Sequence, residues 1–206
     1  MRKPAEVFLY IISKDMNEIV LFIDGENFIY KLEDVLREKR IDKGTIDLTL
    51  INFNTLFNIP LKDFKPGRKI FYAAKLRIYQ ETKKKSEQLI KFQRKLRNAL
   101  VTQGFEFIIA GNVRAQKIDG KLVFKEKGVD VKIAVDMVTM ACDKKIKTAI
   151  LCSSDSDLQP AIKELRERDT EVVYLGFELN PNKGLTATTN RTILFRNSEI
   201  IDVILK

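Results

Sequence analysis

Short apolar runs alternate along this chain with longer segments in which apolar residues recur three or four positions apart. Continuous apolar runs are typical of strands buried on both faces of a parallel sheet. They occur at residues 19–23, 69–74, 105–110, 146–152 and 171–175. Helical spacing occurs at residues 28–39, 82–103, 130–141 and 158–168. This alternation predicts an α/β fold, a three-layer sandwich with a central, mostly parallel sheet of about five strands flanked by helices.

Other segments fit this alternation less clearly. Residues 111–127 alternate around Asp119-Gly120, which predicts a β-hairpin. Residues 41–66 are mixed, with a strand-like pattern at 46–51 and a helical turn at 53–57. Residues 181–190 predict an exposed loop because they combine Pro, Gly, Asn and Thr. We expect residues 193–195 and 200–205 to close the chain as a strand or a short helix.

The 206 residues are expected to form a single domain with an N-terminal extension over residues 1–18. Residues 7–12 are apolar and β-prone, so they predict an extra edge strand, which in a homodimer would be a pairing edge. This run is too short to span a membrane, and no cleavage site follows it. We therefore expect a cytoplasmic protein without a membrane anchor.

The net charge says more about possible partners than the overall composition does. The net charge of +9 and the pI near 9.4 favour a polyanionic partner, nucleic acid first and an acidic membrane surface second. Surplus surface lysine is the alternative. The chain contains no histidine, which excludes histidine general bases and His-ligated zinc. Cys142 and Cys152 lie in apolar segments, and we expect both to be buried free thiols.

Carboxylates follow the predicted strands. Asp24 comes directly after the first strand, Asp130 opens a helix, and Asp155 and Asp157 follow the fourth strand. The carboxyl ends of parallel strands share one edge of the sheet, so these acids are expected to converge there. Clustered carboxylates repel one another unless a cation neutralises them, and Mg²⁺ or Mn²⁺ prefers oxygen ligands. Asn27 lies one helical turn after Asp24, where its amide can orient a phosphate or a metal-bound water.

Each acid also has a structural interpretation. An aspartate ahead of a helix is a good N-cap, which would account for Asp130 and Asp155. Asp24 would likewise stabilise a turn at Gly25. Asp136 lies about 120° around the same helix from Asp130, and it either supports the site from behind or faces solvent.

Cations are concentrated between residues 62 and 97. Lys84, Lys91 and Lys95 share one helix face by their spacing, which suits a phosphodiester backbone. A solvated helix face is the alternative. Lys75 and Arg77 end the second predicted strand and are expected to point towards the acidic edge.

Two further features bear on a nucleic-acid substrate. Lys127 lies close to Asp130 in sequence, where it is expected to meet the scissile phosphate. Tyr72 or Tyr79 is a candidate for stacking on a base, with buried packing as the alternative.

Three of these motifs resemble a known family. D-G-E-N-F at residues 24–28, K-G-V-D-V-K-I-A-V-D-M at 127–137 and S-S-D-S-D-L at 153–158 resemble the NYN domain of PIN-like ribonucleases, close to the bacterial LabA-like branch. The resemblance implies a PIN-like α/β fold, an Mg²⁺ or Mn²⁺ site, RNA as substrate, and products with 5′-phosphate and 3′-hydroxyl ends. It also implies that the metal is held by Asp24, Asp130, Asp155 and Asp157, with Asn27 beside Asp24.

The sequence departs from the family pattern at two positions, because Ser154 replaces a glycine and Leu158 replaces an aromatic residue. Our main hypothesis is a metal-dependent ribonuclease acting on single-stranded or looped RNA, with Ser153 and Asn27 orienting water or phosphate oxygens. One alternative is an RNA-binding regulator without catalysis, which Ser154 favours. The other is a phosphohydrolase for small substrates, which leaves the basic helix unexplained.

Overall fold

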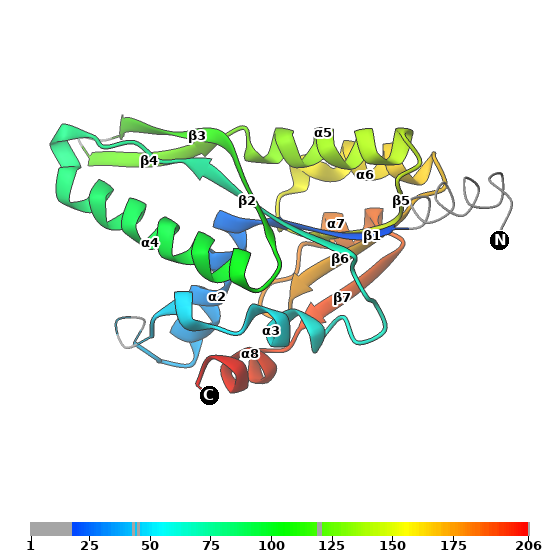
Figure 1. Cartoon of the computed structure of the whole chain (residues 1–206), viewed down its shortest axis with the longest axis horizontal. Helices are drawn as coiled ribbons and strands as arrows, with labels where there is room; N and C mark the ends of the chain where they lie inside the picture. Colours follow the sequence, from blue (N-terminus) through cyan, green and yellow to red (C-terminus); the bar gives the residue numbers. More distant parts are fainter. Residues whose placement is uncertain (1–17, 43, 45, 119–120, 206) are drawn as a thin grey trace, which may run out of the picture.

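The computed structural model describes residues 18–42, 44, 46–118 and 121–205. Its centre is one seven-stranded sheet in the order β4-β3-β2-β1-β5-β6-β7, with helices on both faces (Figure 1). All neighbouring strands are parallel except β3 and β4. The predicted α/β sandwich is confirmed, and the sheet contains two strands beyond the expected five.

The strands have the following bounds: β1 (Glu18–Asp24), β2 (Arg68–Lys75), β3 (Glu106–Ile118), β4 (Lys121–Lys127), β5 (Ile146–Cys152), β6 (Glu171–Phe177) and β7 (Arg191–Phe195). The α-helices are α2 (Gly25–Glu38), α3 (Phe53–Asn58), α4 (Lys83–Thr102), α5 (Val129–Cys142), α6 (Gln159–Arg166), α7 (Lys183–Thr188) and α8 (Asn197–Ile204). Short 3₁₀ turns are η2 (Leu48–Leu50), η3 (Gln80–Thr82) and η4 (Ser156–Leu158).

The sheet separates two hydrophobic cores. Helices α2, α3, α4 and α8 cover one face, and α5, α6 and α7 cover the other (Figure 1). On β1, Leu21 and Ile23 pack into the first core while Val20 and Phe22 pack into the second. Because both faces are covered, the strand must be apolar at every position, and this explains its continuous apolar run. Among the described residues, no helix is long and apolar enough to cross a membrane.

The order of the strands reverses at β1, and we call the carboxyl ends of β1 and β5 at this reversal point the crevice. From β1 the chain builds outward through β2, β3 and β4, and it then returns to place β5 on the other side of β1. Helices that follow β1 and β5 therefore leave towards opposite faces of the sheet. In open α/β sheets, ligands bind at the carboxyl ends of the strands at such a reversal point.

Two predictions for irregular segments were wrong. Residues 181–190 are not an open loop, because α7 forms there with Leu185 fully buried and the Asn182 side chain capping its first turn. The strand-like pattern at 46–51 forms η2 instead, since the Asp47 carboxylate accepts a hydrogen bond from the Thr49 N–H and closes a turn. The helical turn predicted at 53–57 is confirmed as α3.

The remaining predictions for the chain's course are mostly confirmed. The hairpin is present as β3 and β4, and its first arm continues without interruption from the third predicted strand. Residues 193–195 belong to strand β7, and the last segment is helix α8. Cys152 is buried as expected, whereas Cys142 is exposed because it lies in the last turn of α5. The edge strand proposed for residues 7–12 lies outside the described residues.

Candidate acidic site at the carboxyl edge of the sheet

Asp24 lies at the centre of the crevice, where β1 ends and α2 begins. One carboxylate oxygen accepts the Asn27 N–H at 3.2 Å, which caps α2, and the other accepts the Ser153 hydroxyl at 3.1 Å. Only 6% of the residue is exposed. Ser153 directly follows β5, so this second bond joins the ends of the two central strands. Capping thus holds Asp24 in place without using all of its lone pairs.

The charges around Asp24 are mainly negative. Burial raises the pKa of Asp24, and the charges of Asp155 and Asp130 raise it further, against the lowering effect of the two hydrogen bonds. The structure therefore brings three of the predicted acids into one electrostatic neighbourhood. An anionic Asp24 costs stability here unless a cation is bound nearby.

Two glutamates that the sequence reasoning missed extend this cluster. Glu126 ends the hairpin next to Lys127, and its carboxylate accepts the Val129 N–H at 3.0 Å at the start of α5. Burial, followed by the charges of Asp24, Glu26 and Asp130, raises the pKa of Glu126 to about 7. Partial desolvation and the charge of Asp24 also raise the pKa of Glu26. Glu26 stands inside the D-G-E-N-F motif, which was the available signal for it.

The donor set suits a hard divalent cation by its chemistry. Among the described residues, no lysine or arginine forms an ion pair with Asp24, Glu126, Asp130 or Asp155. Across the same residues, no three acidic side chains are close enough to hold one ion together. The acids therefore surround the crevice without forming a closed coordination set. Mg²⁺ tolerates this arrangement well because it keeps several of its water ligands.

The capping interpretation applies to two of the acids and not to the third. Asp155 accepts the Asp157 N–H at 2.9 Å and caps η4, as Asp24 caps α2. Asp130 is not a cap, because Gly128 takes that position in α5 and Asp130 lies in the first turn. Asp157 is exposed, and its charge is not among those that raise the pKa of Asp24. Asp24, Asp130 and Asp155 are therefore the three inner acids.

Asn27 contacts the loop after β5. Its side-chain oxygen accepts both the N–H and the hydroxyl of Ser154, at 3.1 Å and 2.8 Å. The Asn182 amide donates to the Ser154 carbonyl at 2.8 Å, which ties the same loop to α7. The residue that replaces the family glycine thus adds a hydrogen bond to the site. The Asn27 oxygen faces Ser154, and its amide nitrogen has no hydrogen-bond acceptor among the described residues.

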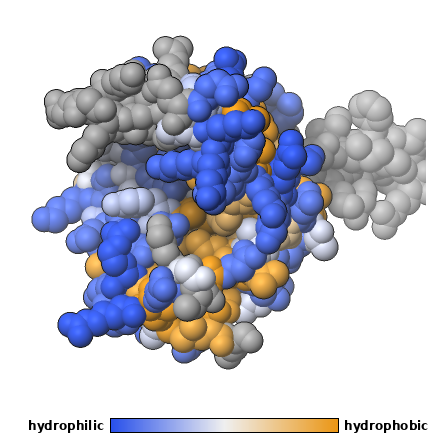
Figure 2. Space-filling model, turned by 90° about the vertical axis from the view of Figure 1, so that its left-hand side faces the viewer, coloured by the Kyte–Doolittle hydropathy of each residue, from blue (hydrophilic) through white to orange (hydrophobic). Residues whose placement is uncertain are grey.

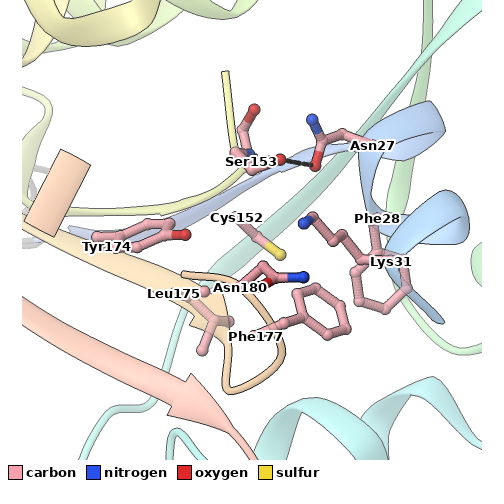
Figure 3. Close-up of a pocket in the computed structure, with 11 residues that line it drawn as sticks. Asn27, Phe28, Lys31, Cys152, Ser153, Tyr174, Leu175, Phe177 and Asn180 are labelled. Atoms are coloured by element: carbon pink, nitrogen blue, oxygen red, sulfur yellow. Dashed lines mark hydrogen bonds between the residues drawn. The ribbon is translucent and has the colours of Figure 1, made fainter. Parts of the chain in front are cut away.

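A small hollow lies beside this loop, between α2 and the end of β6 (Figure 3). Lys31, one turn after Asn27, points into it together with Asn180 (Figure 3). Ser153 lines the same hollow. The hollow is too small to hold a water molecule, so Lys31 is a cation beside the acidic crevice without room for a ligand in front of it. Only its i+4 spacing from Asn27 could have indicated it in the sequence.

The predicted cations are distributed unequally around the crevice. Asn112 on β3 pairs with Lys75 on one side and with Lys127 on the other, so both exposed lysines lie at the same level of the sheet. Arg77 is exposed just beyond β2. On α4, Lys84 and Lys91 are exposed, whereas Lys95 pairs with Asp47 at 3.3 Å. Lys95 is therefore partly neutralised.

Tyr72, Tyr79 and Asp136 have structural roles. Tyr72 is fully buried and donates to Asp136 at 2.9 Å, and Asp136 also accepts from Lys132. Asp136 is therefore not a solvated group, since it joins α5 to the sheet through Tyr72. The Tyr79 hydroxyl donates to the Val113 carbonyl at 2.7 Å. The buried-packing alternative holds for Tyr72, whereas Tyr79 is half-buried with its hydroxyl bonded to the backbone.

Comparisons with known proteins agree with this fold. A search of curated proteins gives no match. A crystal structure of a protein of unknown function from Vibrio parahaemolyticus is similar with a TM-score of 0.55 and 18% identity, covering 94% of this chain and 96% of that one. At this identity the likeness concerns the fold alone. The model of the NYN domain family matches residues 18–196, which include all three motifs. The chain therefore belongs to the NYN domain family.

Proposed function

We propose that this protein is a divalent-metal-dependent ribonuclease that cleaves phosphodiester bonds in single-stranded or looped RNA. The observation that carries the proposal is the cluster of Asp24, Asp130 and Asp155 at the reversal point of the sheet, with which no lysine or arginine of the described residues forms an ion pair. Membership in the NYN domain family supports a nuclease-like role. We further place the chain in the PIN-like group, near its LabA-like branch, and in the cytoplasm.

The roles of the residues follow from their positions. Asp24, Asp130 and Asp155 would hold Mg²⁺ or Mn²⁺, with Asp157 contributing through water. When bound, such an ion lowers the pKa of a coordinated water and stabilises negative charge on the phosphate. Ser153 orients the Asp24 carboxylate by donating to it. Asn27 fixes the loop that carries Asp155 through its bonds to Ser154.

Basic residues around the crevice would bind the RNA backbone. Lys75 and Lys127 lie on either side of Asn112 at the edge of the sheet. Arg77, Lys84 and Lys91 extend the exposed basic surface towards α4. Phosphate contacts of this kind release counterions, so binding should weaken steeply with salt.

A second candidate is an RNA-binding regulator that has lost catalysis. The hydrogen bond from the Ser154 hydroxyl to Asn27 favours it, because a family glycine cannot make this contact. This protein would bind RNA on the same basic surface and leave it intact.

The test is cleavage of end-labelled single-stranded RNA in Mn²⁺ or Mg²⁺, with EDTA as the metal-free control. Asp130→Asn and Asp155→Asn should each reduce the cleavage rate by roughly 100-fold or more, because each removes a charged ligand. Asp143→Asn is the matched control, since Asp143 is exposed beyond α5 and pairs with Lys145. RNA binding without cleavage in either metal would refute the nuclease and support the regulator.

A further inference from the structure

An apolar groove opens beside the acidic crevice, between α2 and α4. Its volume is about 260 Å³, somewhat below the roughly 300–1,000 Å³ of pockets for drug-sized ligands. Figure 2 faces the end of the molecule where β1 and β2 stop, and it shows hydrophobic residues in the middle of this face with hydrophilic residues around them. The groove is therefore of the size for a single flat ring system.

Side chains of α2 and α4 form the two walls of the groove. Ile29 and Tyr30 come from α2, and Leu89 and Phe92 come from α4. The floor is the sheet, where Phe71 and Phe107 are paired in register and stack at 5.5 Å between ring centroids. Ala73 continues the floor with a small side chain, which leaves room above it.

Large apolar side chains stay at the surface in this groove. Tyr30 is 55% exposed and Leu89 is 37% exposed. A flat apolar ligand that covers an exposed aromatic ring beside an apolar floor removes a large apolar area from water, which favours binding. Tyr30 thus offers the exposed ring that Tyr72 and Tyr79 lack.

The groove is continuous with the acidic site. Gly25 and Glu26 line its end and directly follow Asp24. A Cβ on Gly25 would lie 2.2 Å from the Phe71 ring, so α2 starts in direct contact with the floor. Leu76 lines the groove between the exposed cations Lys75 and Arg77. A strand whose phosphate lies at Asp24 would therefore have a neighbouring base within reach of the groove.

We propose that the groove binds one nucleobase of an RNA strand whose backbone passes the acidic site, with Tyr30 stacking on the base. This inference rests on the proposed function, because it assumes that RNA occupies that site. The polar groups of the groove favour a base over a phosphate. Glu26 and Glu33 line it and would repel a phosphate, whereas carboxylates accept hydrogen bonds from the amino groups of bases. The RNA backbone would run along the exposed cations outside the groove.

The test measures binding of a fluorescent single-stranded RNA hexamer by anisotropy, in EDTA so that the RNA stays intact. Tyr30→Ala should weaken binding by about 5- to 150-fold, the range for loss of one base–aromatic stack. Tyr30→Phe should stay within about 2-fold of wild type because it keeps the ring. Leu89→Ala should also weaken binding, while Leu50→Ala, at a leucine that is 82% exposed outside the groove, should not.

An abasic scan identifies the occupant. When the base that enters the groove is removed from the RNA, the effect of Tyr30→Ala should disappear, which a double-mutant cycle measures directly. The inference is overturned if wild-type protein binds RNA and Tyr30→Ala does not change that binding. It is also overturned if Tyr30→Ala weakens binding equally for every abasic RNA. In either case a peptide becomes the better candidate for the ligand of the groove. Failure of the proposed function can be distinguished from failure of this inference. It would appear as no RNA cleavage in Mn²⁺, whatever result the double-mutant cycle gives for RNA binding. Absence of RNA binding would overturn both.

Discussion

Replacing Glu126 by glutamine should make the folded protein more stable at neutral and alkaline pH. The glutamine keeps a side-chain oxygen for the Val129 N–H, so the contact at the start of α5 is retained. What changes is the charge, which lies among Asp24, Glu26 and Asp130. The substitution therefore measures the cost of a half-buried charge, which comes first from burial and then from the neighbouring acids.

The magnitude follows from the pKa of Glu126. It rises from 4.5 to about 7 in the folded protein, which corresponds to about 3.4 kcal/mol at about 1.36 kcal/mol per pKa unit. Because the side chain is only half-buried, solvent screening reduces this to roughly 1–1.5 kcal/mol. Below pH 4.5 the carboxyl is protonated in both states and costs nothing. As pH rises from 4.5 to about 7, the unfolded chain loses the proton first, so wild-type stability falls.

Urea unfolding at pH 4 and pH 8 gives the free energy of unfolding of each protein. Glu126→Gln should be about as stable as wild type at pH 4 and roughly 1–1.5 kcal/mol more stable at pH 8. Glu106→Gln is a control in which the change in stability should have the opposite sign, because hydrogen bonding to Arg68 lowers the pKa of Glu106. It should lose about 0.2–1 kcal/mol at pH 8. Equal stability of Glu126→Gln and wild type at pH 8 would refute the raised pKa of Glu126 in the folded protein.

Three further predictions test single contacts. Ser154→Gly removes the hydroxyl bond to Asn27 but keeps the backbone bond, so urea unfolding should show a loss of about 0.5–1.5 kcal/mol; an unchanged free energy of unfolding would contradict the contact. Tyr72→Phe removes one hydrogen bond to Asp136 and should cost about 1.5–3 kcal/mol without changing the rate of RNA cleavage per folded molecule. A reduced rate would instead place Asp136 in the catalytic machinery. Lys127→Ala should weaken RNA binding alike for all sequences and reduce the salt slope by about 1 in a log–log plot of anisotropy-derived affinities, whereas a sequence-dependent loss would assign Lys127 to base recognition.

The sheet could be predicted from the sequence because its strands are covered on both faces. Val20 to Ile23 are all fully buried, so one continuous apolar run was a sufficient signal. Helix α7 could not be predicted in this way, since its six residues have weak helical propensity and depend on tertiary contacts. Burial of Leu185 and the cap from Asn182 stabilise it.

The acidic site could be predicted where an acid follows a strand or, like Asp130, lies in the first turn of a helix. Asp24 and Asp155 met the first condition, and the strand order brings them together across β1 and β5. Glu126 was missed because its place depends on the register of β4 against β3, where it pairs with Val113. The role of Tyr30 was missed for a related reason, since the gap beside it depends on how far α4 lies from α2. Spacing along one helix carries no information on that distance.

The most direct test of the central claim is the rate of RNA cleavage by the wild-type protein as the Mn²⁺ concentration is raised from zero. The acidic cluster at the ends of β1 and β5 predicts no cleavage in EDTA, a rate that rises with Mn²⁺ and saturates, and products that end in 5′-phosphate and 3′-hydroxyl groups. Cleavage that continues unchanged in EDTA, or tight RNA binding with no cleavage at any Mn²⁺ concentration, would contradict it.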